Sequence, residues 1–492
     1  MEDILLRIHS FVWGVPALLL ILGVGIYLSI RTRFVQLRRF PDAVRAFLVS
    51  ARSREDGSFQ ALCTALAATV GTGNIAGVAG AIAIGGPGSI FWMWLCAIVG
   101  MVTKMAEALL SVRFRHRDRD GNALGGPMYM IEQGMGKSWR PLAVCYCFFG
   151  VIAAFGVGNA TQINAVTDSV RIAYRTAGRE PSGILILAIG VLMAAGAVVS
   201  LMGGGKKVGK LAVMLVPSAS IGYILLAVGA LIAHSTALPG ALHSIAKGAF
   251  SPAAVTGGAV GSAVVALRIG TARGVFTNEA GMGTAAIAHG GSEVKDPMNQ
   301  GLLGCMEVFL DTIVICTLTA LVVLTSGVNI PYGLDEGAAL TIRAFVATYG
   351  NWVSVVMVFF MFIFAFATML GWGLYGLHCA RYLLGEEAWK PFVVIQAVTA
   401  LGSIVLKTET VWILSDTVNG LMAIPNLICL SALSSEVIEI CTDKKPDAAA
   451  GSVRGTVIRK ESQKEEGKCT DLPSRRKFAD QARYLPEEQY RR

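Results

Sequence analysis

Long apolar runs with few charges recur along this 492-residue chain and are separated by short polar connectors. Runs of about 18 or more such residues are typical of transmembrane helices, because a helix satisfies its own backbone hydrogen bonds in hydrocarbon. The pattern therefore predicts an all-α polytopic membrane protein. Eleven spans are expected, at about 11–30, 61–84, 88–112, 142–170, 183–202, 208–233, 255–289, 301–327, 350–380, 391–407 and 411–434.

Two of these spans are interrupted where a spanning helix should be continuous. The first reads ALCTALAATVGTGNIAGVAGAIAIGG, with Gly71 and Gly73 beside Thr72 and Asn74. The second begins about 190 residues later and reads VTGGAVGSAVVALRIGTARGVFTNEAGMGTAAIAH. An opened helical turn at membrane depth is tolerated only where it is buried in protein or lines a cavity. Paired interruptions in matching positions are the best pointer in a sequence to the binding site of a transporter.

The remaining spans divide evenly once the first span is set aside. Five follow in each half, and each half opens with an interrupted span. An odd number of spans per half gives the halves opposite orientations, so the pattern predicts an inverted repeat, which suits alternating access. The expected organisation is an N-terminal transmembrane helix with a basic connector (1–60), a first repeat (61–235), a second repeat (250–435) and a disordered cytoplasmic tail (436–492).

Composition and charge support a membrane location. Hydrophobic residues make up 54% of the chain and charged residues 15%, against about 25% charged in globular proteins. The net charge of +9 gathers in connectors and tail. Its distribution predicts that the N-terminus lies outside and the tail in the cytoplasm of the cell (inner) membrane. Membrane lipid, and not nucleic acid, is therefore the expected partner of the basic residues.

The basic connector between the first two spans has its own pattern. Its apolar residues fall near helical spacing among arginines over about 31–54. This spacing predicts an amphipathic helix on the cytoplasmic face, with its arginines toward lipid phosphates. An ordinary solvated loop is the alternative.

The interruption at 71–74 could serve two kinds of ligand. The end of the first half-helix leaves carbonyl groups that suit a cation, and the second half-helix presents N–H groups that suit a carboxylate. The candidate oxygen ligands are the carbonyls of Ala67, Thr69 and Val70 and the side chain of Asn74. The second interruption offers Thr277 and Asn278 in the same way. Together, two opposed interruptions would hold a zwitterionic small amino acid and a cation.

Other side chains could complete such a site. Thr368 could supply a hydroxyl to the cation, and Phe276 and Trp372 could close a small apolar pocket. Gln162 could face the cavity or form a hydrogen bond between helices. Glycines in membrane helices also allow close packing, but two polar-flanked runs in matching positions favour a binding role.

Ionisable residues inside spans are costly and are therefore functional candidates. Lys104 and Glu107 are three residues apart and are expected to pair on one helix face. Asp311 is the better candidate to contact ions or a polar network, and Glu279 follows the second interruption directly.

Enzymatic motifs are missing from the sequence. There is no HExxH or GxSxG motif, and the GGKKVGK run places Leu211 where a phosphate loop requires Ser or Thr. Most of the ten cysteines lie inside spans, which argues against a disulfide framework or a zinc site. The chain is therefore not expected to be an enzyme or to carry an organic cofactor.

Several long motifs closely resemble the alanine or glycine:cation symporter family. They are TVGTGNIAGVAGAIAIGGPGSIFWMW, GNALGGPMYMIEQGMG, ARGVFTNEAGMGTAAIAH and VNGLMAIPNLICL, and the similarity covers about residues 10–440. The resemblance implies a leucine-transporter-like superfold, with ten core helices in two inverted five-helix repeats plus one extra N-terminal transmembrane helix. It also implies uptake of alanine or glycine, with D-alanine as a further candidate, driven by sodium or, less often, by protons.

The resemblance also implies roles for individual residues. One sodium site that touches the substrate carboxylate would contain Thr69 and Asn74, and a second would contain Ala67, Val70 and Thr368. The implied substrate contacts are Thr72, Gly73, Gly274, Phe276 and Thr277, with Gln162 and Trp372 shaping the pocket. One departure affects the cytoplasmic end of its span, where this chain reads LYGLHC, with Leu377 and His378, in place of a tyrosine-rich run.

The sequence thus predicts a secondary-active symporter that couples uptake of a small neutral amino acid to a cation by alternating access. A passive small-solute channel is the first alternative, and it would neither depend on sodium nor accumulate its solute. A membrane-embedded enzyme is the second, and it would alter the amino acid chemically.

Overall fold

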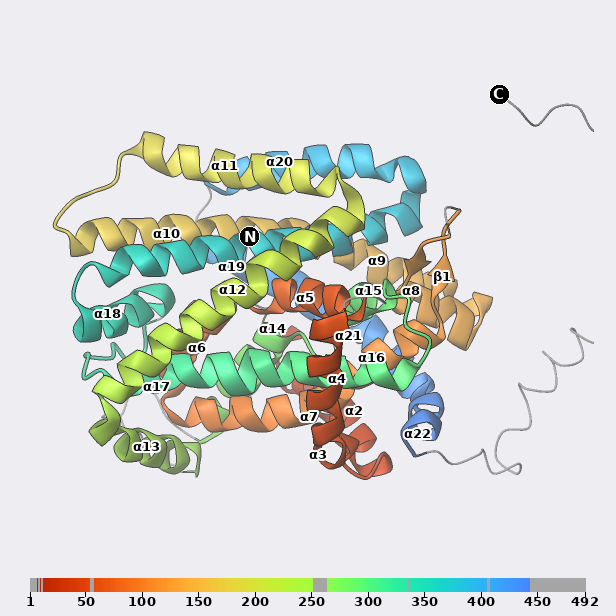
Figure 1. Ribbon diagram of the computed structural model, residues 1–492, viewed down its shortest axis with the longest axis horizontal. Coiled ribbons are helices and arrows are strands. Elements are labelled where there is room, and N and C mark those ends of the chain that lie inside the picture. Colours follow the sequence, from red (N-terminus) through yellow and green to blue (C-terminus); the bar gives the residue numbers. More distant parts are fainter. Residues whose placement is uncertain are drawn as a thin grey trace, which may run out of the picture. The chain divides into compact units, whose positions relative to one another are not determined.

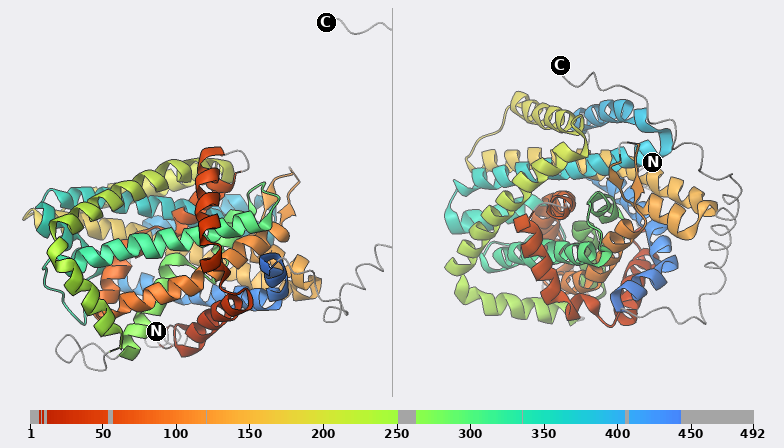
Figure 2. Two further views of the ribbon diagram at one scale, coloured as in Figure 1. Left: turned by 60° about the horizontal axis from the view of Figure 1, so that its bottom comes forward. Right: turned by 45° about the vertical axis from the view of Figure 1, so that its right-hand side comes forward.

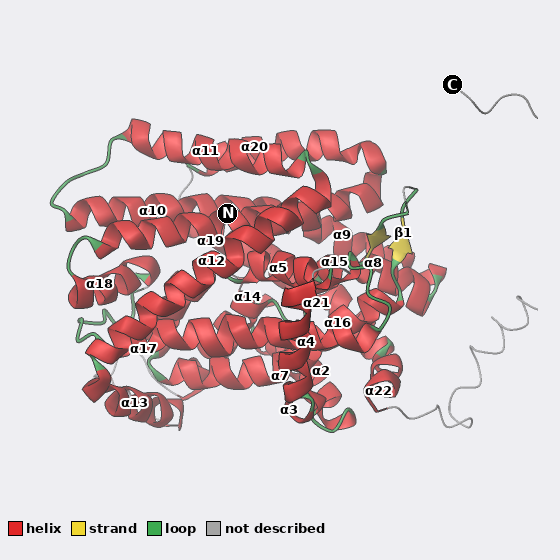
Figure 3. Ribbon diagram, viewed as in Figure 1, coloured by secondary structure: helices red, strands yellow, loops and turns green. Residues whose placement is uncertain are grey.

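Helices make up almost all of the described part of the chain (Figures 1 and 3). The computed structural model describes residues 7, 9, 12–53, 57–119, 121–250, 263–334, 336–404 and 408–442. The predicted tail beyond residue 442 lies outside the described residues, as do residues 255–262 of the second interrupted span.

The first half of the chain begins with α2 (Val15–Arg31), α3 (Val35–Arg38) and α4 (Phe40–Ser53). The next elements form the first predicted repeat, in which η marks a short 3-10 or π-helical segment. They are α5 (Ser58–Thr69), η1 (Gly73–Gly77), α6 (Val78–Gly85), α7 (Gly88–Arg113), β1 (His116–Arg117), β2 (Ala123–Leu124), α8 (Pro127–Tyr129), η2 (Met130–Met135), η3 (Lys137–Trp139), α9 (Arg140–Phe155), η4 (Gly156–Ala160), α10 (Thr161–Thr176), α11 (Gly183–Leu201) and α12 (Gly204–Ala233).

The rest of the described chain begins with a short connecting segment that leads to the second predicted repeat. Its elements are η5 (Ser235–Ala237), α13 (Leu238–Phe250), α14 (Ala263–Asn278), α15 (Thr284–Gly290), α16 (Pro297–Val308), η6 (Phe309–Cys316), α17 (Thr317–Thr325), α18 (Gly337–Tyr349), α19 (Val353–Leu384), η7 (Glu386–Ala388), α20 (Trp389–Ser403), α21 (Thr408–Ala432) and α22 (Ser434–Thr442). The last helix covers the start of the segment that we predicted to be a disordered tail.

Each predicted span has a helical counterpart. Among the described residues, seven helices are long and apolar enough to cross a membrane, and the pair α5 and η1–α6, bent by 51°, makes an eighth. The three other predicted spans are the shorter α2, the broken pair α14–α15 and α20. Two spans that read as continuous in the sequence contain a π-helical segment, namely η4 and η6.

Corresponding helices of the two halves lie side by side. Helix α7 packs against α16, its counterpart in the second half, and α11 packs against α20. The pair α11–α20 is visible at one edge of the helical unit (Figures 1 and 2). Residues Leu109 and Gly301 are close at one end of the α7–α16 contact, and Trp94 bonds Thr317 beyond its other end. The two segments are therefore antiparallel, as an inverted repeat requires.

Small residues allow the helices around α7 to approach closely. A Cβ on Gly304 would lie 2.9 Å from the carbonyl oxygen of Lys104, and a Cβ on Gly270 would overlap the carbonyl oxygen of Ser89. Lipid tails are as apolar as the helix surfaces, so the hydrophobic effect does not drive membrane helices together. Their association depends instead on such close van der Waals packing. Helix α7 is thereby held tightly between α14 and α16.

The basic connector is helical, as predicted; Phe40 and Phe47 face protein, whereas Phe34 is exposed. The ring of Phe40 in α4 packs edge-on against Phe309 at 4.8 Å, and Phe47 packs against Phe59. Arg38 and Arg45 are exposed. The amphipathic helix therefore covers the bundle near η6 and α5 with its aromatic face.

A two-stranded hairpin connects α7 to α8 and contacts the loop after α15. Arg115 donates to the carbonyl oxygens of Ser292 and Val294, both at 2.7 Å. Arg117 pairs with Glu293 at 2.9 Å, and this hydrogen bond lowers the pKa of the Glu293 carboxyl. The hairpin thus ties the end of the second interrupted span to α7.

The close approach of α14 to α7 can be tested by Gly270→Ala. The added methyl would collide with backbone that has no room to move, so we expect a loss of about 1–3 kcal/mol in stability. Thermal unfolding in detergent would measure it. The matched control is Gly23→Ala in α2, where a Cβ meets nothing within 4 Å, and helix propensity alone predicts no loss. Equal unfolding temperatures for the two variants would contradict the proposed packing constraint.

Candidate functional site

The first interrupted span is broken at Val70–Thr72. Helix α5 ends at Thr69, and Val70 adopts an extended conformation with φ −75° and ψ 91°. The amide of Gly71 donates to the side-chain oxygen of Asn74 at 2.8 Å, which replaces the helical acceptor that this amide has lost. Helix geometry resumes as the π-helical segment η1. The predicted interruption is confirmed.

Asn74 also connects the first break to η6. Its amide nitrogen Nδ2 donates to Oδ1 of Asp311 at 2.6 Å and lies 3.3 Å from the sulfur of Cys316. Asp311 is fully buried, and its second carboxylate oxygen accepts from Thr312 at 2.8 Å. Thr312 in turn accepts from Nδ2 of Asn278 at 3.2 Å. A continuous set of hydrogen bonds therefore joins the two breaks.

The second break lies between Asn278 and Thr284, which end α14 and begin α15. Gly281 and Gly283 have positive φ angles of 94° and 78°, and Glu279 adopts φ 54° without being glycine. Such an angle is uncommon for a residue with a side chain and marks a backbone position held by its surroundings.

Two carboxylates hold this second break. Oε1 of Glu107 accepts from the amides of Gly281 and Gly283, at 2.9 and 3.0 Å, and from Asn426 at 2.7 Å. The carboxylate of Glu279 accepts from the indole of Trp372 at 2.8 Å and from Thr284 at 2.7 Å. The prediction that Lys104 pairs with Glu107 is wrong, because Lys104 forms an ion pair with Glu307 at 3.1 Å.

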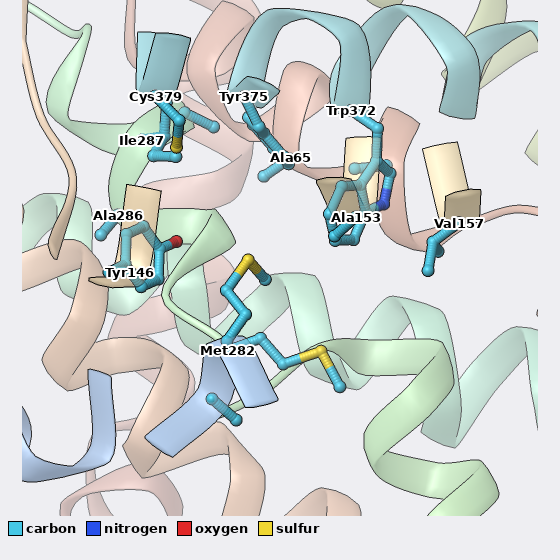
Figure 4. Close-up of a cluster of buried hydrophobic side chains, with 14 of the residues drawn as sticks. Ala65, Tyr146, Ala153, Val157, Met282, Ala286, Ile287, Trp372, Tyr375 and Cys379 are labelled. Atoms are coloured by element: carbon cyan, nitrogen blue, oxygen red, sulfur yellow. The ribbon is translucent and has the colours of Figure 1, made fainter. Parts of the chain in front are cut away.

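An apolar cluster surrounds the second break. Figure 4 shows Met282 from the break beneath Trp372, with Tyr146 to one side and Ala153 of α9 near the indole. All of these side chains are buried. Because water is excluded there, the hydrogen bonds of the break act in a medium of low dielectric constant.

Most of the predicted substrate residues meet where the two breaks face each other. A Cβ placed on Gly73 would lie 3.2 Å from the methyl of Thr277 and 3.5 Å from the ring of Phe276. The hydroxyl of Thr72 donates to Oε1 of Gln162 at 3.1 Å. The two halves of the molecule thus approach within van der Waals distance around Gly73.

The predicted cation residues lie beside the first break. Ala67 and Val70 are buried, and a Cβ on Gly71 would lie 2.6 Å from the hydroxyl oxygen of Thr368. The Thr368 hydroxyl is buried and has no hydrogen-bond partner among the described residues. The hydroxyl of Thr69 bonds back to the carbonyl of Ala65 at 3.2 Å. Among the described residues, this hydroxyl is thus an unpartnered buried oxygen beside a helix end, and such an oxygen could serve as one ligand of a hard cation.

Three predicted substrate residues have further contacts in the structure. The Cα of Gly274 faces α7, where a Cβ would meet Cys96 at 3.4 Å. Trp372 binds Glu279 through its indole and packs on Gly158. Phe276 is half-buried, and its ring lies 5.7 Å from that of Trp412.

The functional residues that the sequence left unassigned are Glu107 and Asn426 as partners of the second break and Glu307 as partner of Lys104. Their burial inside spans was a signal of importance, but their partners lie more than 100 residues away in the chain. Asp311, by contrast, occupies the polar network that we predicted for it.

Comparisons with known proteins identify the family and the fold. A family model described as the sodium:alanine symporter family matches residues 1–455. The sodium/alanine symporter AgcS of Methanococcus maripaludis is 40% identical over 442 residues, which are 88% of this chain and 94% of AgcS. The Bacillus subtilis protein named "Probable sodium/glutamine symporter GlnT" is 35% identical over 92% of both chains. The crystal structure of MhsT in complex with L-phenylalanine superposes with a TM-score of 0.53 at 14% identity, covering 78% of this chain and 97% of MhsT.

The role of Glu107 at the second break predicts the effect of Glu107→Gln. Hydrogen bonds to a charged acceptor are worth more than neutral ones, so losing the charge should cost about 2 kcal/mol of stability. Thermal unfolding in detergent is the measurement. Glu293→Gln, at an exposed pair, is the control and should cost less than about 1 kcal/mol. If both variants unfolded at the wild-type temperature, the carboxylate would not be needed to hold the break.

Proposed function

Because the chain belongs to the sodium:alanine symporter family, it is a sodium-coupled amino-acid symporter with a leucine-transporter-like fold, and we propose that its substrate is alanine or glycine, including D-alanine. It is a multi-pass membrane transporter and not an enzyme. The observation that carries the proposal is the close approach of the two breaks. A single methyl group on Gly73 would come within 3.2 Å of Thr277, which favours a cargo with a small side chain.

The geometry around the breaks supports an assignment of substrate contacts. The amides at the start of η1, near Thr72 and Gly73, would bind the carboxylate, because a helix N-terminus stabilises negative charge. Phe276 and Thr277 would contact the small side chain from the other half. Gln162 orients Thr72, Trp372 of α19 supports the second break, and Gly274 lets α14 pack closely on α7.

Two cation positions fit the first break. One sodium ion would bind near Thr69 and Asn74, where Asp311 accepts a hydrogen bond from Asn74. The other would bind the carbonyls of Ala67 and Val70 and the hydroxyl of Thr368, which has no hydrogen-bond partner among the described residues. Oxygen ligands of this kind suit a hard cation. A proton in place of sodium is the alternative coupling ion.

The charge distribution supports an orientation as well. We place the protein in the cell (inner) membrane with its N-terminus outside and its tail in the cytoplasm, where its basic connectors meet membrane lipid. No nucleic acid is needed to account for the positive charge.

Counterflow in liposomes tests the proposed function. Purified protein would be given a panel of labelled amino acids, with sodium present or replaced by choline, and with or without a pH gradient. We expect accumulation of alanine or glycine only with sodium. Uptake without accumulation would indicate a channel, and accumulation in choline under a pH gradient would indicate proton coupling.

Asn74→Ala and Thr368→Val separate the two cation positions. Asn74 serves the ion next to the substrate carboxylate, so its loss should raise both the half-saturating sodium concentration and the KM for the amino acid at least tenfold. Thr368→Val removes a buried hydroxyl at nearly constant volume, so only the sodium dependence should weaken. Uptake titrations with sodium and with amino acid are the measurement, and unchanged sodium activation in Asn74→Ala would contradict the assignment.

Gly73→Ala tests the size limit of the pocket. The added methyl would occupy space that the side chain of alanine needs, and overpacking by one methyl costs about 1 kcal/mol or more. The ratio of kcat/KM for glycine over alanine should therefore rise about fivefold. Gly77→Ala is the matched control, since a Cβ there meets nothing within 4 Å, and it should leave this ratio unchanged. If the ratio in Gly73→Ala equalled that of the wild-type protein, the cargo would not lie against Gly73.

A further inference from the structure

Lys104 is a buried cation that the proposed binding site does not use. It belongs to α7, and its side chain has no exposed surface. The ammonium pairs with Oε1 of Glu307 at 3.1 Å and donates to the carbonyl oxygen of Asn278 at 2.8 Å. Burying an ammonium and a carboxylate costs several kcal/mol per ion, and an apolar pair of similar volume is often as stable. Stability alone therefore gives no reason for an ion pair at this place.

The position of the ammonium is informative. Asn278 is the last residue of α14, so its carbonyl belongs to a helix end whose acceptors lack helical donors. Lys104 supplies that donor. The side chain of Asn278 is held in turn, because its Oδ1 accepts from Ala280 at 3.0 Å and its Nδ2 donates to Thr312. Fixing the backbone of Asn278 thus fixes the direction of its amide group.

From Asn278 the hydrogen bonds lead to the first break. Thr312 donates to Asp311, and Asp311 accepts from Asn74. Asn74 then accepts from the amide of Gly71. Four side chains after Lys104, the series reaches the helix end at which sodium is proposed to bind.

The series continues in the other direction to α15. The second oxygen of Glu307 lies 3.2 Å from Nε2 of His289, and Nδ1 of His289 lies 2.6 Å from the amide of Gln300. Lys104 and Glu307 therefore contact both halves of the second interrupted span, through Asn278 of α14 and His289 of α15.

We propose that Lys104 is a positioning residue for sodium coupling. Held by Glu307, it fixes Asn278 and, through Thr312 and Asp311, sets the position of Asn74 at the first break. In return, an ion bound beside Asn74 favours one arrangement of the second break. Lys104 touches neither ion nor cargo. This inference rests on the proposed sodium site at Asn74, and it adds the path by which that site is coupled to the second repeat.

The test removes the ammonium together with the carboxylate that forms its ion pair. In Lys104→Met/Glu307→Gln both charges disappear, the side chain lengths are nearly kept, and the amide introduced by Glu307→Gln can still bond His289. We expect near-normal yield and unfolding temperature. The half-saturating sodium concentration for uptake should rise at least tenfold, with a smaller change in the amino-acid KM at saturating sodium. Wild-type sodium activation in this variant would overturn the proposal and leave Lys104 as a purely structural partner of Glu307.

Thr312→Val provides an independent break in the same path. It removes the link between Asn278 and Asp311 and leaves every charge in place. We expect the same shift in sodium activation, and the two changes combined should shift it no further than either alone, since residues in one network are not additive. If the shifts in half-saturating sodium concentration multiplied in the combined variant, the path would be overturned. Wild-type sodium activation in Thr312→Val would also overturn it, even if the Lys104 variant does not fold.

A binding measurement separates this inference from the proposed function. Stabilisation of detergent-solubilised protein by sodium, relative to choline, would be followed as the change in unfolding temperature. If wild-type protein shows no stabilisation and no sodium-dependent uptake, the proposed function fails. If wild-type protein responds to sodium and the Lys104 and Thr312 variants respond equally, the function stands and the positioning role is wrong.

Discussion

Backbone groups inside a membrane need hydrogen-bond partners, and the whole arrangement around the two breaks depends on how this need is met. At the first break the chain supplies its own partner, since Asn74 takes the amide of Gly71 three residues away. At the second break the partner comes from a different helix, because Glu107 of α7 accepts from Gly281 and Gly283. The second break can therefore exist only after α7, α14 and α15 have packed together. A site made in this way is a property of the assembled bundle.

The two breaks differ in how firmly they are held. A carboxylate holds the second, and hydrogen bonds to a charged acceptor are roughly twice as strong as neutral ones. A neutral amide holds the first, and the hydroxyl of Thr368 beside it has no partner among the described residues. The first break thus has the backbone and side-chain oxygens that a cation could recruit at little cost. This difference between the repeats supports our proposal that the cation positions fall at the first break, although both repeats contain an interrupted helix.

Sequence reasoning was most successful where a local rule of membrane chemistry applies. Glycine and polar residues inside an apolar span indicated both breaks, and counting spans gave the inverted repeat. The same reasoning named Asp311 as a candidate for a polar network and Asn74 as a candidate cation ligand. It failed for Lys104, and it could not find Glu107 and Asn426 as partners of the second break. Those contacts depend on which face of α7 turns toward α14 and α16, and a helix that is apolar on every side carries no pattern that fixes its rotation. The burial of Lys104 could be read from the sequence, whereas its distance to Glu307 required the packed helices.

Alternating access requires that the interrupted helices change their contacts with the surrounding helices while the two end states stay within a few kcal/mol of each other. Within the part of the chain that the structure describes, side-chain hydrogen bonds tie the breaks to α10 and α19 through Thr72 to Gln162 and Trp372 to Glu279. The neutral one is worth about 0.5–1.5 kcal/mol and the one to a carboxylate about 1.5–3 kcal/mol. Contacts of this size can be exchanged for contacts with a small cargo and its ion. The ion pair of Lys104 and Glu307 lies between α7 and α16, and separating it would leave buried charges unpaired at a cost of about 3–5 kcal/mol. The energies therefore favour a cycle in which α7 and α16 keep this contact while the bonds to α10 and α19 are the ones that open.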